Sequence, residues 1–115
     1  MTTNILKSYI TDVADFPKKG IIFKDITSLL ESPKGVKICL DSLLLGLKNK
    51  QIDKVVAVEA RGFFFGMLLA QTLNVPFFPV RKPGKLPRKV VSQSFDLEYG
   101  SDILELHEDA IKSGD

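Results

Sequence analysis

The 115-residue sequence is poor in the residues that carry redox and metal chemistry. It has one cysteine, Cys39, one histidine, His107, and no tryptophan. One cysteine cannot form an internal disulfide, and no spacing typical of a metal site exists. A reducing, cytoplasmic environment is therefore expected. We expect Cys39 to be a small core residue, and His107 to lie on an exposed strand face without a functional role.

Long apolar runs and a strong charge of one sign are also missing. The longest apolar stretch, around Phe63–Ala70, is interrupted by Gly66 and is far shorter than the roughly 20 residues of a membrane helix. The first 16 residues lack the unbroken apolar core of a signal peptide. The formal net charge of +2 is too small to indicate a nucleic-acid partner. We therefore expect neither a membrane nor a nucleic acid as partner.

Arginine is scarce, and its three positions fall in one part of the chain: Arg61, Arg81 and Arg88. Its planar guanidinium can bind a phosphate through two hydrogen bonds, whereas lysine acts as a point charge. This clustering supports an anion site in that part of the chain, although three residues are few enough to cluster by chance.

Enough apolar residues are present, 44% of the chain, for one core, and we expect residues 1–115 to form a single, partial domain. Periodicity and chain breakers predict the order of elements. They are a helix over Thr3–Val13, a loop over Asp15–Gly20, an extended Ile21–Lys24, a helical turn over Thr27–Glu31, a helix beginning at Pro33 after the cap Ser32, a strand over Lys54–Val58, a helix over Phe63–Leu73, a strand over Val75–Val80, two hairpin strands over Val90–Leu97 and Ile103–His107, and a helical turn over Glu108–Lys112.

The strand–helix–strand order between Lys54 and Val80 is a βαβ unit, which predicts parallel strands and an α/β fold. Ligands of such sheets bind beyond the carboxyl ends of the strands. Here Glu59–Gly62 follows the first strand and Arg81–Lys89 follows the second, and five of the nine residues in Arg81–Lys89 are basic. Two neighbouring strand ends that carry cations predict a small polyanionic ligand such as pyrophosphate. A solvated basic loop would give the same pattern.

Four segments carry a resemblance to a known family. They are Phe16-Pro17-x-x-Gly20-Ile21-x-Phe23-Lys24-Asp25, Glu59-Ala60-Arg61-Gly62-Phe63, Val80-Arg81-Lys82-Pro83-Gly84-Lys85-Leu86-Pro87 and Leu97-Glu98-Tyr99-Gly100. In this order and spacing the chain resembles the adenine phosphoribosyltransferases. The resemblance implies a type I phosphoribosyltransferase-like parallel sheet flanked by helices, with a hairpin extension that acts as a lid, incomplete at its C-terminus.

The resemblance implies a reaction of purine salvage, in which adenine and phosphoribosyl pyrophosphate give AMP and pyrophosphate. Mg²⁺ is expected to accompany the pyrophosphate, bound through substrate oxygens and water. A homodimer is also implied. We expect no metal site made by the protein's own side chains.

Site residues follow from the matching positions, as the resemblance implies. Ile22, Phe23 and Lys24 would line the adenine slot, with Lys24 standing where the family commonly has arginine. Ala60, Arg61, Gly62, Arg81, Lys82 and Lys85 would bind pyrophosphate. The Glu59–Ala60 peptide would be strained or cis. Glu98 would exchange a proton with adenine, and Tyr99 would lie beside the hinge of a lid over Lys82–Phe95.

Family members continue past the turn at Ser113-Gly114-Asp115 with a strand, an acidic pair and a glycine-rich loop that holds the ribose 5-phosphate. The sequence lacks that loop, so we expect little or no activity from this chain alone. Two alternatives to an enzyme stay open: a non-catalytic remnant that dimerises with an intact copy and, ranked last, a nucleic-acid module built on Arg81–Lys89.

Overall fold

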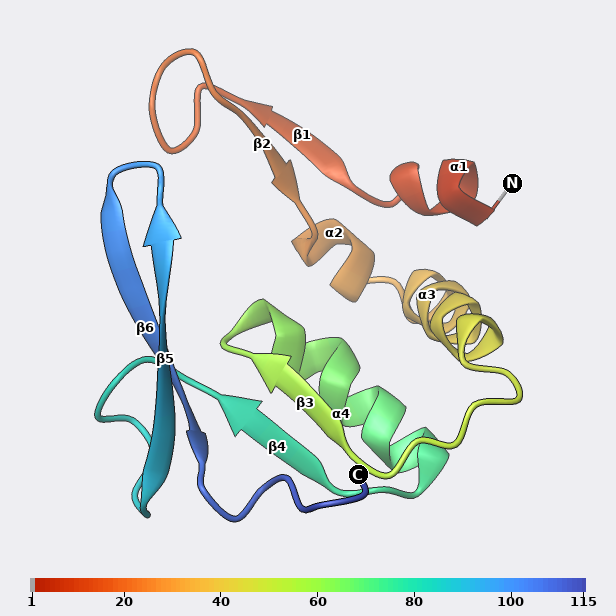
Figure 1. The fold of residues 1–115 in the computed structure, drawn as a ribbon. Helices are drawn as coiled ribbons and strands as arrows, with labels where there is room; N and C mark the ends of the chain where they lie inside the picture. Colours follow the sequence, from red (N-terminus) through yellow and green to blue (C-terminus); the bar gives the residue numbers. More distant parts are fainter. Residues whose placement is uncertain (1) are drawn as a thin grey trace. The chain divides into compact units, whose positions relative to one another are not determined.

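A computed structural model describes residues 2–115, and the side chains from Asn4 onward. Contacts divide the chain into two compact units, Met1–Asn49 and Lys50–Asp115. Each unit is described by itself below. Figure 1 labels the elements. The prediction of one partial domain over residues 1–115 stays a prediction.

The first unit combines a two-stranded sheet with helices. Its elements are α1 (Thr2–Lys7), β1 (Thr11–Ala14), β2 (Ile22–Asp25), α2 (Thr27–Leu30) and α3 (Pro33–Gly46). β1 and β2 are antiparallel, with Val13 opposite Phe23 and Asp12 opposite Lys24. The predicted helix over Thr3–Val13 was therefore wrong beyond its first half, because residues 11–14 pair with β2 instead of extending the helix.

Helix α3 begins as the sequence predicts. Pro33 is its first residue, and the Ser32 hydroxyl oxygen accepts a hydrogen bond from the Gly35 backbone N–H at 3.0 Å. Gly35 is buried, and a β-carbon there would lie 2.9 Å from side-chain atoms of both Leu29 and Tyr9. Glycine is thus the residue that lets α3 approach its neighbours. Burial raises the pKa of the Cys39 thiol on α3, which keeps it in the unreactive protonated form.

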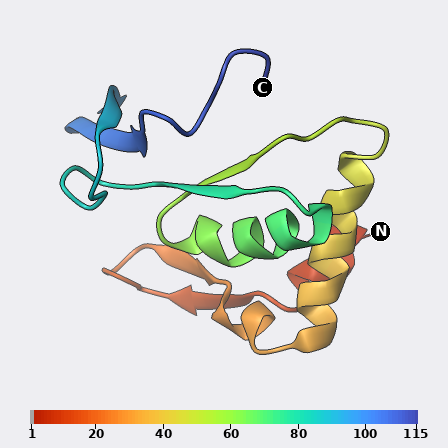
Figure 2. The same cartoon turned by 90° about the horizontal axis from the view of Figure 1, so that it is seen from below.

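The second unit is built on the predicted βαβ unit: β3 (Val55–Val58), α4 (Arg61–Leu73) and β4 (Phe77–Val80). The two strands are parallel and in level register, from Val55 opposite Phe77 to Val58 opposite Val80. Figure 2 shows α4 running along one face of this strand pair. This confirms the α/β class and the parallel connection.

Close packing of α4 on the strands depends on two glycines. A β-carbon at Gly66 would lie 2.7 Å from Phe77 Cε1 and 2.8 Å from Ala57 Cβ, and one at Gly62 would lie 3.3 Å from Ala57 Cβ. The aromatic rings of Phe63 and Phe77 add an edge-to-face contact at 5.8 Å. Gly62, expected to admit a ligand to the backbone, has a packing reason for being glycine as well.

A long hairpin follows the basic loop. Its strands are β5 (Val90–Leu97) and β6 (Gly100–His107), paired antiparallel over their whole length. The turn lies at Glu98–Tyr99, so β6 begins three residues before the predicted Ile103, and Gly100 opens it with a φ of +101° that favours glycine. β6 also joins the core through Arg81, whose backbone exchanges hydrogen bonds of 2.9 and 2.8 Å with Glu105.

After β6 the chain returns to the start of β3. Glu108–Lys112 contains a turn instead of the predicted helical turn. The Lys54 ammonium holds this tail by donating to the Ala110 carbonyl at 2.6 Å and pairing with the Asp115 carboxylate at 2.5 Å. It also lies 5.4 Å from the centroid of the Phe78 ring. No helix within residues 2–115 has both the length and the apolar character to cross a membrane.

Candidate functional site

The carboxyl end of the β3–β4 pair gathers the predicted anion-binding residues of the second unit. Because Val58 and Val80 are register partners, the segments that follow them leave the sheet at the same edge. Ala60 caps α4 without a side-chain hydrogen bond, and Arg61 is the first residue of the helix. The start of α4 therefore keeps backbone N–H groups that no side chain caps, a feature that favours an anion. The Glu59–Ala60 peptide is cis, as the resemblance implies.

Arg81 is held in place by Glu59, a residue for which the sequence indicated no role. The Arg81 Nε donates to Glu59 Oε1 at 3.1 Å, and the same oxygen accepts from the Lys82 backbone N–H at 2.9 Å. The Lys82 N–H is the main cause that lowers the pKa of Glu59, and Arg81 and the charge of Lys85 contribute. The Glu59 carboxylate is thus stabilised by three basic residues that follow β4: Arg81 and Lys82 through hydrogen bonds, and Lys85 through its charge.

Carboxylates neutralise most of the basic loop, which the count of its basic residues did not show. Lys82 pairs with Asp102, Arg88 with Asp109 at 2.8 Å and Lys89 with Glu108 at 3.4 Å. Within residues 2–115, the remaining cations at the strand ends, Arg61 and Lys85, form no ion pair within 4.0 Å. At the strand ends a polyanion would therefore find Arg61 and Lys85 unpaired among the described residues, and Arg81 and Lys82 already paired with carboxylates.

Two residues of β6, Glu105 and His107, hold the loop over Arg81–Lys89 and the strand that follows it. Glu105 accepts from the Gly84 N–H at 3.1 Å and from the Ser92 hydroxyl at 2.8 Å. At its other end, the Arg88 backbone N–H donates to His107 Nε2 at 3.4 Å, and Arg88 Nη2 lies 3.3 Å from His107 Nδ1. The basic loop is therefore tied to β6 at several points.

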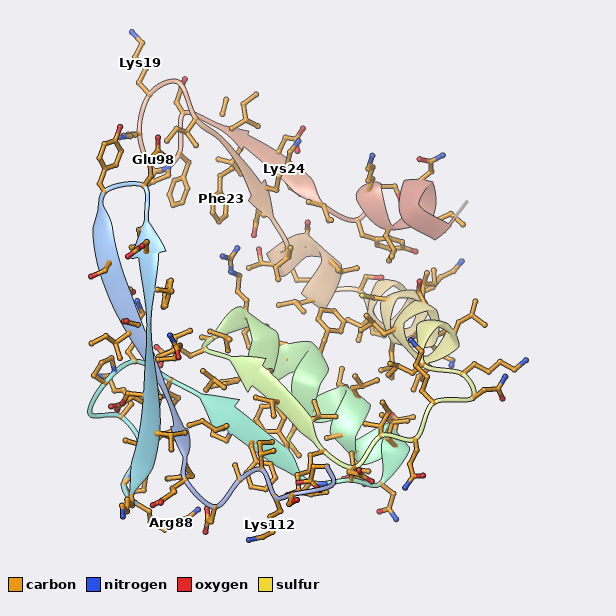
Figure 3. All side chains as sticks on the ribbon, in the orientation of Figure 1. Lys19, Phe23, Lys24, Arg88, Glu98 and Lys112 are labelled. Atoms are coloured by element: carbon orange, nitrogen blue, oxygen red, sulfur yellow. The ribbon has the colours of Figure 1, made fainter. Side chains whose placement is uncertain are left out.

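His107 was wrongly placed by the sequence analysis. Its side chain is buried, with 8% exposure, where an exposed strand face was predicted. Donors of Arg88 lie beside both ring nitrogens, and the nitrogen that carries no proton accepts from one of them, since a neutral imidazole has one acceptor nitrogen. The third arginine thus joins the end of the basic loop to β6; Figure 3 shows Arg88 at the open end of the β5–β6 hairpin.

The first unit contains a pocket of about 340 Å³ beside Phe23, lined by Val13, Phe16, Phe23, Asp25 and Thr27. The rings of Phe16 and Phe23 meet edge to face at 5.2 Å. Asp25 accepts hydrogen bonds from the Thr27 N–H and hydroxyl, and these bonds lower its pKa. An apolar pocket with a few fixed polar groups suits a flat heteroaromatic ring.

The three predicted adenine residues do not share this pocket. Side chains alternate along a strand, so Ile22 and Lys24 face away from Phe23, and Figure 3 shows Phe23 and Lys24 leaving β2 on different sides. Lys24 pairs with Asp12 at 2.7 Å and lines a second hollow with Lys7 and Ile10. Ile22 is 62% exposed. Only Phe23 of the three contributes its side chain to the pocket.

Glu98 and Tyr99 form the tip of the β5–β6 hairpin, as Figure 3 shows for Glu98. Tyr99 is 89% exposed. Their roles toward adenine and a lid stay predictions. Within the described residues no three His, Cys, Asp or Glu side chains gather as a metal site.

A parallel strand pair covered by a helix, with cations beyond its carboxyl end, defines an α/β protein with a candidate anion site at its strand ends. No protein-family model matches the chain. Among curated proteins, it is 54% identical over 110 residues to the adenine phosphoribosyltransferase of Christiangramia forsetii, a match that covers 96% of this chain and 64% of the relative.

Solved structures agree with that relationship. The adenine phosphoribosyltransferase of Thermoanaerobacter pseudethanolicus matches with a TM-score of 0.90 and 48% identity, over 96% of this chain and 64% of that one. The Saccharomyces cerevisiae enzyme, solved with adenine and a bisphosphate, matches with a TM-score of 0.90 and 37% identity, over 98% and 66%. The chain belongs to the adenine phosphoribosyltransferase family, and it spans somewhat less than two thirds of these relatives' length.

Proposed function

We propose that this chain supplies the adenine-binding and pyrophosphate-binding parts of an adenine phosphoribosyltransferase, which transfers phosphoribosyl from phosphoribosyl pyrophosphate to adenine and releases AMP and pyrophosphate. The observation that carries the proposal is 54% identity to a curated enzyme of that name over nearly the whole chain. The cations at the level ends of β3 and β4 support it independently, because they fit a departing pyrophosphate.

In this proposal the second unit binds the pyrophosphate group. The backbone of Ala60 and Gly62, with Arg61, lies at the start of α4, while Arg81, Lys82 and Lys85 approach from the end of β4. These groups stabilise the charge that develops on the leaving group. Mg²⁺ arrives with phosphoribosyl pyrophosphate as part of the substrate, coordinated by its oxygens and by water.

The first unit binds adenine in the proposal. Phe23 supplies an aromatic face in the pocket that it shares with Phe16. Ile22 and Lys24 would contribute through their backbone, because their side chains face away from Phe23. Glu98 would take up or deliver the proton at the imidazole edge of adenine, with Tyr99 beside the lid. We further propose a homodimer that works in the cytosol, where the single Cys39 stays reduced.

The test separates ligand binding from catalysis. Isothermal titration calorimetry of the 115-residue chain with pyrophosphate and with adenine should give one saturable site for each. Arg81→Ala should weaken pyrophosphate binding to a measurable but clearly lower affinity and leave adenine binding unchanged. Binding of neither ligand by the folded chain would refute the proposal. A parallel assay that converts labelled adenine to AMP measures activity of the chain itself, and sedimentation velocity measures its association state.

A further inference from the structure

A single carboxylate controls how Arg81 is presented at the end of β4. Glu59 Oε1 accepts from both Arg81 Nε and the Lys82 N–H, at 3.1 and 2.9 Å. The Glu59 backbone N–H also donates to the Val80 carbonyl at 3.0 Å, so Glu59 is joined to β4 by its main chain and its side chain. The two side chains are partly buried, with 20% exposure for Glu59 and 35% for Arg81.

The bond to Nε determines which edge of the guanidinium is left for a ligand. An arginine has five N–H donors in a planar fork. Glu59 uses the Nε–H, and the backbone of Arg81 is fixed on its other side by two hydrogen bonds to Glu105. The edge formed by the two terminal nitrogens is then available for a bidentate contact with phosphate oxygens.

We propose that Glu59 is a positioning residue, which orients the Arg81 guanidinium and the Lys82 backbone toward pyrophosphate without touching the ligand. The inference rests on the proposed function for its ligand, and on the Glu59–Arg81 geometry for its mechanism. Orientation before binding matters because less side-chain entropy is lost when the anion arrives.

The negative charge of Glu59 acts in the opposite direction. A carboxylate beside the site repels pyrophosphate, so charge alone predicts that any neutral residue at position 59 binds the anion more tightly. Positioning predicts a different order. Glutamine keeps an oxygen that can accept from Arg81 and Lys82, whereas alanine keeps none. The two variants Glu59→Gln and Glu59→Ala therefore separate the two effects.

The experiment measures pyrophosphate affinity by calorimetry for the wild type, Glu59→Gln, Glu59→Ala, Arg81→Ala and the double variant Glu59→Ala/Arg81→Ala. We expect Glu59→Gln to bind within about threefold of the wild type and Glu59→Ala about tenfold more weakly. In the Arg81→Ala background, Glu59→Ala should have a much smaller effect, because only the Lys82 backbone N–H is left for Glu59 to position. A structural defect would weaken binding equally in both backgrounds and overturn the proposal, as would tighter binding by both neutral variants.

A second readout needs no ligand and separates this inference from the proposed function. In ¹⁵N NMR spectra, the Arg81 Nε–H signal should be shifted and slow to exchange in the wild type and in Glu59→Gln. It should become fast-exchanging in Glu59→Ala. If the wild type fails to bind pyrophosphate but shows this pattern, the pyrophosphate part of the proposed function is refuted while the positioning of Arg81 stands. An Arg81 signal that is identical in all three proteins refutes the positioning.

Discussion

The Lys82 ammonium on the basic loop is paired with the carboxylate of Asp102 on β6. Lys82 is one of the residues that the proposed function assigns to pyrophosphate. The bond to Lys82 is the main cause that lowers the pKa of Asp102, so the pair is charged at neutral pH. Pyrophosphate must therefore compete with Asp102 for Lys82.

Asp102→Asn should strengthen pyrophosphate binding, because it releases Lys82 from its charged partner. The pair is partly exposed, so the gain should be about two- to fivefold. Calorimetry at fixed ionic strength measures it. Asp96→Asn is the matched control, since it removes one negative charge from β5 of the same hairpin. An equal gain in both variants would show a general charge effect and contradict the competition.

Gly66→Ala should destabilise the second unit. The added methyl would meet Phe77 and Ala57 at less than 3.0 Å, and overpacking of this kind costs about 1–3 kcal/mol. Gly46→Ala is the control, because Gly46 also lies in a helix and has no atom within 4 Å of the added position. It should stabilise the chain by up to about 1 kcal/mol. Urea denaturation followed by circular dichroism measures both variants, and similar midpoints for the two would contradict the packing argument.

The stability contributed by Asp25 should be lost in acid. Thr27 lowers the pKa of Asp25 below its ordinary value of 3.8, so the contribution is complete above pH 3.8 and disappears as the pH falls through the lower, folded-state pKa. The difference in unfolding free energy between wild type and Asp25→Asn should therefore shrink between about pH 5 and about pH 2. Denaturant titrations across that range measure it, with Asp41→Asn as a control for loss of one charge. A difference that stays constant would refute the linkage.

Phe23→Ala should weaken adenine binding while leaving pyrophosphate binding unchanged. A stacked aromatic face contributes about 1–3 kcal/mol per base, which corresponds to a loss of roughly 5- to 150-fold in affinity. Phe95→Ala on β5 is the control, because it removes an equally large ring from another part of the chain. Calorimetry with adenine measures both variants. Equal adenine affinity for Phe23→Ala and the wild type would exclude the pocket beside Phe23 as the adenine site.

Local signals were enough to predict the βαβ elements of the second unit. Each pattern fits one type of element only: the β-branched run before Val58 and the run ending at Val80 fit strands, and the nearly all-apolar segment between them fits a helix. The strand–helix–strand order then predicted that the two strands are parallel. The cap at Ser32 was equally local. By contrast, Tyr9, Ile10 and Val13 fit a helical period, yet Val13 lies in β1 because it pairs with Phe23. Partners that are distant in sequence decided the structure there.

The candidate site likewise has residues that local signals predicted and residues that depend on contacts distant in sequence. Its cations could be predicted, because they follow the ends of recognisable strands. Their carboxylate partners could not be predicted, because Glu59 and Arg81 are 22 residues apart in sequence and Lys82 and Asp102 are 20 apart. Such contacts depend on the strand register and on the path of the loop. The burial of His107 against Arg88 was missed for that reason too. A strand pattern gives the alternation of faces but not which face another segment covers.

The contacts of Lys54 with Ala110 and Asp115 couple local unfolding of the segment after β6 to that of β3. Residues 54 and 110 are 56 positions apart. The hydrogen bond of the Lys54 side chain to Ala110 therefore closes a loop that contains most of the second unit. The tail cannot leave without breaking the contacts of Lys54, the residue that directly precedes β3. Amide protons near Ala110 and those of β3 should therefore exchange with deuterium as one cooperative block, and Lys54→Met should make the tail exchange early and separately.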